Sequence, residues 1–333
     1  MTHKIRFATL GDVESIMQFI NEHWKENHIL SSNRKFFLYE FKEGQKINFV
    51  LALGSDNKVL GILGFIKASQ CSGDIFTVMW KALKVKYSPM LGIEMFNFLR
   101  YFNKQNRIIG VGANANTLPL YDYLGLYTDS LNQYYIVNKD IRKYHVIKVN
   151  NEESYFTPIN DTNGNREISV ISEERLRYNF DSNDFIPHKD ESYFIKKYFH
   201  HPINKYDVHG VSYNGKISSL FVTRVQEYQA SKILRIVEYI GDQKDIIYAT
   251  TYLYNIILAN SYEYVDFLCF GFDHDNLLKA GFNKLDPHSD DVIVPNYFSP
   301  FIQKNIIIYF MADTVEIEKI RLCKADGDQD RPS

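Results

Sequence analysis

The chain has 333 residues, with 38 basic and 40 acidic side chains and a formal net charge of −2 at pH 7. This near-neutral balance gives no electrostatic case for a nucleic-acid or anionic-membrane partner. No apolar run approaches the roughly 20 residues that span a bilayer, and no signal peptide is evident, so we expect a cytoplasmic protein without a membrane span. The three cysteines (Cys71, Cys269 and Cys323) are odd in number and form no CxxC pair, which favours neither a disulfide framework nor a metal site.

The first elements alternate between strand and helix patterns. Residues 5–8 alternate as a short strand, and apolar side chains then recur at helical spacing from Val13 to Ile20. Residues 49–53 and 59–66 flank the turn 54–57 and predict a hairpin. A further strand is expected over 74–83, followed by a break at Ser88-Pro89 and a helix through Leu99.

The most informative stretch lies between residues 108 and 126. A β-branched strand pattern is followed by Asn114, a short helix carrying Tyr121, and Gly125 where a helix C-cap favours positive φ. This order can place an amide and a phenol in one cleft, and a phenol of pKa about 10 can donate a proton to a leaving thiolate. A tyrosine packed in the core is the alternative. A last strand of this half is expected over 132–138.

A boundary is expected between residues 140 and 170, where turn-forming polar residues replace the apolar periodicity. Beyond it a similar order recurs. Strands are expected at 168–171, 206–211, 218–224, 234–240 and 265–270, and helices at 173–178, 245–260 and 276–282. We therefore expect two domains, residues 1–145 and residues 146–333.

The element order of residues 4–140, with Asn114 seven residues before Tyr121 and Gly125 closing the helix, resembles the GNAT family of acyl-CoA-dependent N-acyltransferases. The resemblance implies an α/β (α+β) fold in two GNAT-like domains, each with a mixed, mostly antiparallel sheet flanked by helices. It also implies an acyl-CoA donor, acetyl-CoA or another, bound by the first half.

In that family a Q/R-x-x-G-x-G/A turn before the third helix holds the CoA pyrophosphate on backbone amides. Here residues 87–92 match only at Gly92, because Tyr87 and Met90 replace the first and middle motif residues. The second half has two acidic residues, Asp242 and Asp245, in the corresponding turn, which would repel a pyrophosphate. The resemblance implies that the donor contacts lie in the first half, at Met79, Ala82, Leu83, Ser88, Gly92 and Asn114.

The chemistry implied is direct attack of a neutral amine on the thioester. Tyr121 would protonate the thiolate, and Asp74 or Glu40 would accept the amine proton. Each carboxylate also fits a solvated or capping role.

The acceptor is assigned to the second half. His201 is a candidate base or phosphate ligand, although a loop histidine is the plainer interpretation. Glu238 interrupts an apolar strand and faces either the surface or the cleft. The ending Asp326–Pro332 resembles that of GNAT-like proteins of bacterial surface-polysaccharide and nucleotide-sugar pathways, which implies a tail folded over the cleft with Arg331 available for phosphate. Removing the last ten residues is then expected to leave the melting temperature nearly unchanged.

These observations favour an N-acyltransferase acting on a nucleotide-linked amino sugar as a monomer or homodimer. The alternatives are a Fem-type aminoacyl transferase using aminoacyl-tRNA, against which the charge argues, and a non-catalytic GNAT-like binding protein.

Overall fold

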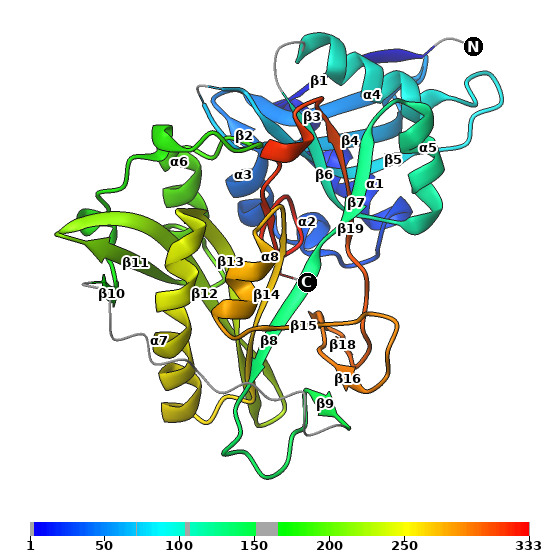
Figure 1. Cartoon of the computed structure of the whole chain (residues 1–333). Helices are drawn as coiled ribbons and strands as arrows, with labels where there is room; N and C mark the ends of the chain where they lie inside the picture. Colours follow the sequence, from blue (N-terminus) through cyan, green and yellow to red (C-terminus); the bar gives the residue numbers. More distant parts are fainter. Residues whose placement is uncertain (1–2, 71, 104–106, 151–165, 333) are drawn as a thin grey trace.

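The computed structural model describes residues 3–70, 72–103, 107–150 and 166–332 and shows two large sheets, one in each half of the chain (Figure 1). Most neighbouring strands in both sheets are antiparallel. The predicted fold class is therefore confirmed. In the described part of the chain no helix is long and apolar enough to cross a bilayer, and no group of three His, Cys, Asp or Glu side chains could hold a metal ion.

The first sheet has helices on both faces. Its strands follow the order β1-β3-β4-β5-β6-β19-β7, with β2 beside β3: β1 Lys4–Thr9, β2 Lys42–Glu43, β3 Lys46–Leu53, β4 Val59–Lys67, β5 Ile75–Ala82, β6 Ile108–Ala113, β19 Tyr309–Asp313 and β7 Tyr127–Ser130. One face packs on α1 Val13–His23, α2 Ile29–Ser32 and α3 Arg34–Phe41, and the other on α4 Leu91–Phe102 and α5 Leu118–Tyr123. The predicted hairpin is confirmed as β3 and β4, with Leu53 opposite Val59.

The second sheet follows the order β10-β11-β12-β13-β14-β8-β15, with β20 beside β14. Its strands are β10 Arg166–Val170, β11 Asp207–Tyr213, β12 Lys216–Tyr228, β13 Ser231–Gly241, β14 Tyr264–Phe270, β8 Asn132–Val137, β15 Asn283–Lys284 and β20 Leu322–Cys323. Its helices are α6 Glu191–Phe194, which continues as the π-helical turn η6 Ile195–Phe199, then α7 Ile246–Ala259 and α8 His274–Lys279. Two small ribbons pair β9 Lys148–Val149 with β16 Val292–Ile293, and β17 Tyr297–Phe298 with β18 Phe301–Ile302.

The two halves exchange a strand. β8, expected to complete the first half, instead pairs with β14 in the second sheet, and β19 from the end of the chain enters the first sheet between β6 and β7. The expectation for β8 was wrong because alternation identifies a strand but not its partner. In Figure 1 the continuous β7–β8 ribbon crosses from one sheet to the other. The division at residue 145 remains a proposal, since each sheet contains a strand from both sides of it.

Short helical elements account for the remaining differences. The expected helix at 173–178 is only the 3₁₀ turn η4 Glu173–Arg175, and the helix that packs on this part of the core is α6 with η6. Other 3₁₀ turns are η1 Leu10–Asp12, η2 Ala115–Thr117, η5 Phe180–Ser182, η7 Gln243–Asp245 and η8 Ile317–Lys319. Most of the linker, residues 151–165, lies outside the described residues, as does Cys71.

Each sheet splays open at one pair of parallel strands. β5 and β6 pair only at Ile75–Ile108 and Phe76–Ile109, and β13 and β14 pair only over Leu234–Ile236. The end of the chain runs through both openings, and the C-terminus lies between the halves (Figure 1). The Ala325 amide donates to the Val237 carbonyl in the second sheet, and Gln329 Nε2 donates to the Val111 carbonyl in the first.

Candidate functional site

The tail, residues 324–332, forms the wall between two cavities. Lys324, Ala325, Asp326 and Asp330 are buried, and the Arg331 side chain is 5% exposed. A cavity of about 110 Å³ lies on one side of this tail and one of about 650 Å³ on the other, and Asp328, Asp330 and Arg331 line both. The polar tail is therefore an internal part of the site.

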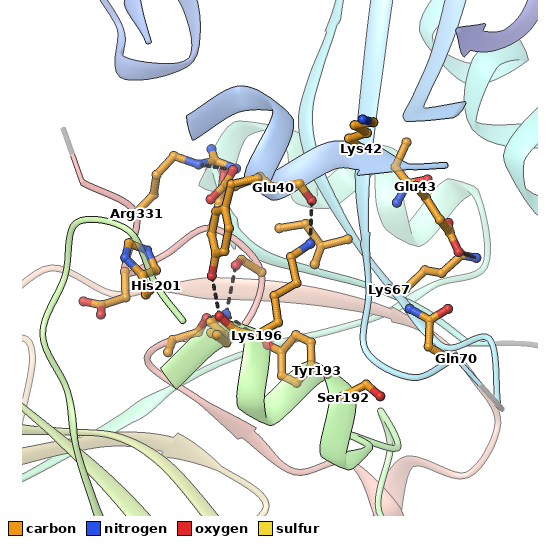
Figure 2. A pocket seen from close by; sticks show the side chains of 18 of the residues that line it. Glu40, Lys42, Glu43, Lys67, Gln70, Ser192, Tyr193, Lys196, His201 and Arg331 are labelled. Carbon is orange, nitrogen blue, oxygen red and sulfur yellow. Dashed lines mark hydrogen bonds and ion pairs between the residues drawn. The ribbon is translucent and has the colours of Figure 1, made fainter. Parts of the chain in front are cut away.

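Three of the predicted residues meet at the smaller cavity. Glu40 on α3, His201 after η6, and Arg331 of the tail all line it (Figure 2). Arg331 Nε donates to Glu40 Oε2 at 2.9 Å, and its Nη1 donates to Asp328 Oδ2 at 2.8 Å. Arg331 is thus held between two carboxylates and is not a free phosphate ligand.

His201 faces the same cavity as a hydrogen-bond donor. Its Nδ1 accepts from the backbone amides of Ile203 and Asn204, at 3.2 and 2.8 Å. The proton of the neutral ring therefore lies on Nε2. Burial, together with the charge of Lys197, lowers the His201 pKa to about 4, so the ring is neutral at pH 7. This arrangement suits binding of an acceptor oxygen better than removal of a proton.

A β-bulge marks the middle of β5. Opposite it, the register with β4 jumps between Ile62–Lys81 and Gly64–Val78, so two residues of β5 face Leu63. Met79 has φ +52°, a left-handed conformation that costs a non-glycine residue roughly 1–2 kcal/mol. A bulge removes a residue from the regular ladder, and backbone strain of this kind concentrates at functional sites.

The larger cavity borders this bulge. Met79 lines it from the first half, together with Trp24, Lys25 and His28 near the end of α1. Arg224, Arg235 and Lys324 line it from the second half and the tail. The strained backbone at Met79 therefore borders the larger cavity, where it could contact a bound reactant.

The other predicted donor contacts lie around α4. Leu83 cannot offer its amide to a thioester oxygen, because that amide already donates to the Leu60 carbonyl at 2.8 Å. Ser88 is buried and donates to Glu94 in the first turn of α4. An added Cβ at Gly92 would lie in ordinary contact, 3.5 Å, with Trp80 Nε1, so this position also has room for a small side chain. Ala82 pairs with Gly61 at the end of β5.

The N-terminus of α4 is open to an anion. Met90, at the N-cap, provides no side-chain acceptor. The Leu91 amide donates to the Ser88 carbonyl at 3.3 Å and the Glu94 amide to the Met90 carbonyl at 3.0 Å, which leaves the amides of Gly92 and Ile93 as the candidate anion donors of this turn. Glu94 opposes an anion, although it already accepts from Ser88 and bonds to His3. The residues fit a pyrophosphate on the amides of this turn, with fewer contacts than the family motif supplies.

Tyr121 and Asn114 lie beyond this turn. The Tyr121 ring stacks on Trp80 with centroids 6.1 Å apart, and burial raises the pKa of its phenol. Asn114 Oδ1 accepts from the Asn116 amide at the start of η2, so this side chain serves the turn itself.

Asp74 and Glu238 lie away from both cavities. Asp74 is fully buried and accepts from the backbone amides of Arg107 and His188, which joins the two halves. Glu238 neither reaches the surface nor lines a cavity: it accepts two bonds from Lys189 Nζ, at 2.9 and 2.7 Å, and one from Tyr198. The sequence could not reveal these partners, because each lies on a distant segment.

Comparisons support the architecture. No protein-family model and no curated protein sequence matches the chain. Among solved structures, a GCN5-related N-acetyltransferase from Anabaena variabilis is similar at TM-score 0.58 and 10% identity, over 93% of this chain and 72% of that one. A conserved protein of unknown function from Enterococcus faecalis, described as a probable N-acyltransferase, is similar at TM-score 0.56 and 11% identity, over 96% and 74%.

The chain has the GNAT fold. Because the matches cover nearly the whole chain, the likeness extends over both halves. In the first half the splayed strands are β5 and β6, and the bulge lies in β5. The tail enters both openings, at Ala325 in the second sheet and at Gln329 in the first. In the second half Asp245 also occupies the start of α7, where it accepts from Arg166, Ser218 and Ser219.

Several residues of the site were not predicted from the sequence. Tyr39, Tyr193, Lys197 and Tyr206 line the smaller cavity, and Trp24, His28 and Lys324 line the larger one. The sequence did not indicate them because they lie on helices and loops of both halves, and only the exchange of strands between the sheets brings these segments together. The polar tail was the one feature that could have indicated Lys324.

Proposed function

We propose that the protein is a GNAT-type N-acyltransferase that transfers an acyl group from acyl-CoA to the amine of a nucleotide-linked amino sugar. The observation that carries this proposal is the bulge at Met79, which adjoins both the splay of β5 and β6 and the cavity between the halves. The GNAT fold of the solved neighbours supports the reaction class.

The donor is assigned to the first half. The first-turn amides of α4 hold its pyrophosphate, and the backbone at Met79 polarises the thioester carbonyl. Tyr121 is the proton donor to the thiolate. Its raised pKa keeps the phenol protonated at neutral pH, which a proton donor requires.

The amine proton passes to Glu40. Of the two carboxylates predicted as bases, Glu40 lines a cavity, whereas Asp74 is buried in backbone hydrogen bonds. Glu40 Oε2 accepts from Arg331, which orients the carboxylate. Neutral His201 donates from Nε2 to an oxygen of the acceptor. The reaction breaks the thioester C–S bond and forms an amide, with the amine proton leaving through Glu40 and a proton reaching sulfur from Tyr121.

Mass spectrometry of reaction mixtures tests the proposal. Acetyl-CoA and a panel of UDP- and dTDP-linked amino sugars are incubated with the protein, and a product 42 Da heavier is expected together with one equivalent of free thiol. A binding protein without activity gives neither product nor thiol, and an aminoacyl-tRNA user forms product only when charged tRNA replaces acetyl-CoA.

A further inference from the structure

Lys324 is a buried cation without a carboxylate partner in the described chain. The residue is 2% exposed, and its Nζ donates to the Gln329 carbonyl at 2.6 Å. No salt bridge joins it to a carboxylate among the described residues, although buried lysines are normally paired. Two of its three N–H donors therefore remain for another acceptor.

The three carboxylates whose charges act on Lys324 are already engaged. Asp330 accepts from Arg224 at 2.8 Å, Asp328 accepts from Arg331, and Asp266 accepts two bonds from Arg235. The cavity of about 650 Å³ that Lys324 lines also has Lys25 in its wall. Its lining thus carries an excess of positive charge, and its volume is that of a small-molecule site.

Two further features of the wall suit a base or sugar attached to an anion. Asn296 is 3% exposed, and its Oδ1 has no hydrogen-bond partner among the described residues. Trp24 is 46% exposed, and the Tyr297 ring lies 5.4 Å from Lys324 Nζ. An aromatic face can stack on a base of any identity.

We propose that the cavity between the halves binds the diphosphate of a nucleotide, with Lys324 as its central phosphate ligand, Asn296 Oδ1 accepting from a ligand N–H or O–H, and Trp24 stacking on the base. This inference rests on the proposed function. It places the nucleotide end of the acceptor in this cavity, and the amine end then reaches Glu40 and His201 of the smaller cavity past Asp328 and Arg331, which line both. Met79 lines the same cavity, so a nucleotide-linked sugar held by Lys324 extends toward the strained segment of β5.

The protonation of Lys324 gives the proposal its own signature. Burial and the nearby charge of Arg235 lower the Lys324 pKa to about 8, whereas Asp330, Asp266 and Asp328 act in the opposite direction. A bound phosphate raises that pKa again. At pH 8 nucleotide binding is therefore accompanied by proton uptake, which calorimetry measures by comparing buffers of different ionisation enthalpy.

The test titrates UDP, dTDP, inorganic pyrophosphate and CoA separately into the wild-type protein, Lys324→Met and the control Lys58→Met. Lys58 is exposed in the turn between β3 and β4. UDP or dTDP should bind the wild type and the control with proton uptake at pH 8. Lys324→Met should weaken that binding by roughly tenfold to hundredfold and abolish the uptake. Its melting temperature should hold or rise, because an unpaired buried charge is removed.

The outcomes are separable. If nucleotide diphosphates do not bind, or bind Lys324→Met as well as wild type, the inference is overturned whether or not acetyl-CoA binds. If CoA alone depends on Lys324, the cavity belongs to the donor and the acceptor assignment is overturned. If nucleotide binding depends on Lys324 but acetyl-CoA does not bind, the inference stands and the proposed function falls.

Discussion

The contact between the tail residue Gln329 and strand β6 of the first sheet can be tested at Gly112. This glycine has φ +88°, and an added Cβ would lie 2.0 Å from Gln329 Nε2. Gly112→Ala therefore costs roughly 1–2 kcal/mol in backbone strain. It also expels the Gln329 side chain and its hydrogen bond to the Val111 carbonyl, worth about 1 kcal/mol. The expected total loss in the free energy of unfolding is about 2–3 kcal/mol.

A double-mutant cycle isolates the contact. Gln329→Ala alone should cost about 1 kcal/mol, and Gly112→Ala in that background should cost only the strain, about 1–2 kcal/mol. Urea denaturation of the four proteins gives the coupling, expected at about 1 kcal/mol. Additive effects would show that Gln329 does not occupy the splay of β5 and β6, and the wall between the two cavities would then be misplaced.

Three further predictions concern the site and the tail. Tyr121→Phe keeps the stack on Trp80, so acetyl-CoA affinity by calorimetry should change less than about twofold while kcat falls about 10²-fold; an unchanged kcat would remove Tyr121 as the acid. Glu40→Gln should lower kcat by a similar factor, whereas Glu22→Gln, an exposed control on α1, should leave kcat unchanged. Burial raises the Asp326 pKa from 3.8 to about 6, against the opposing charge of Lys189, so the folded protein holds this proton more tightly than the unfolded chain. That contribution to stability is complete below pH 3.8 and is lost as pH rises through 6. Between pH 4 and 7 the free energy of unfolding of Asp326→Asn should therefore rise by up to about 3 kcal/mol relative to that of the wild type. The same difference in the free energy of unfolding between wild type and Asp326→Asn at both pH values, measured by denaturation, would contradict this prediction.

The local elements could be predicted from the sequence because their signals are local. Apolar spacing gave α1 and the β3–β4 hairpin, and the Ser88-Pro89 break gave the start of α4. The partner of β8 and the place of β19 could not be predicted, because pairing between distant strands leaves no mark in either segment.

Residues of the candidate site could be predicted only where the resemblance to the GNAT family assigns a role to a particular position in the sequence. Met79 was expected in the donor site, and the structure adds its bulge and strain. The tail was expected to cover a cleft and to be dispensable for stability. Its burial instead predicts that removing residues 324–333 lowers the melting temperature, since Lys189 and Glu40 would lose Asp326 and Arg331.

The most direct test of the account is acetyl-CoA binding measured by calorimetry with wild type, Gly92→Glu and Ser55→Glu. Gly92 lies in the first turn of α4, and Ser55 is exposed in the turn between β3 and β4. We predict that the wild type and Ser55→Glu bind acetyl-CoA and that Gly92→Glu does not, because its carboxylate meets the pyrophosphate at the helix N-terminus. Absence of binding to the wild type, or equal binding by all three proteins, would contradict a donor site in the first half.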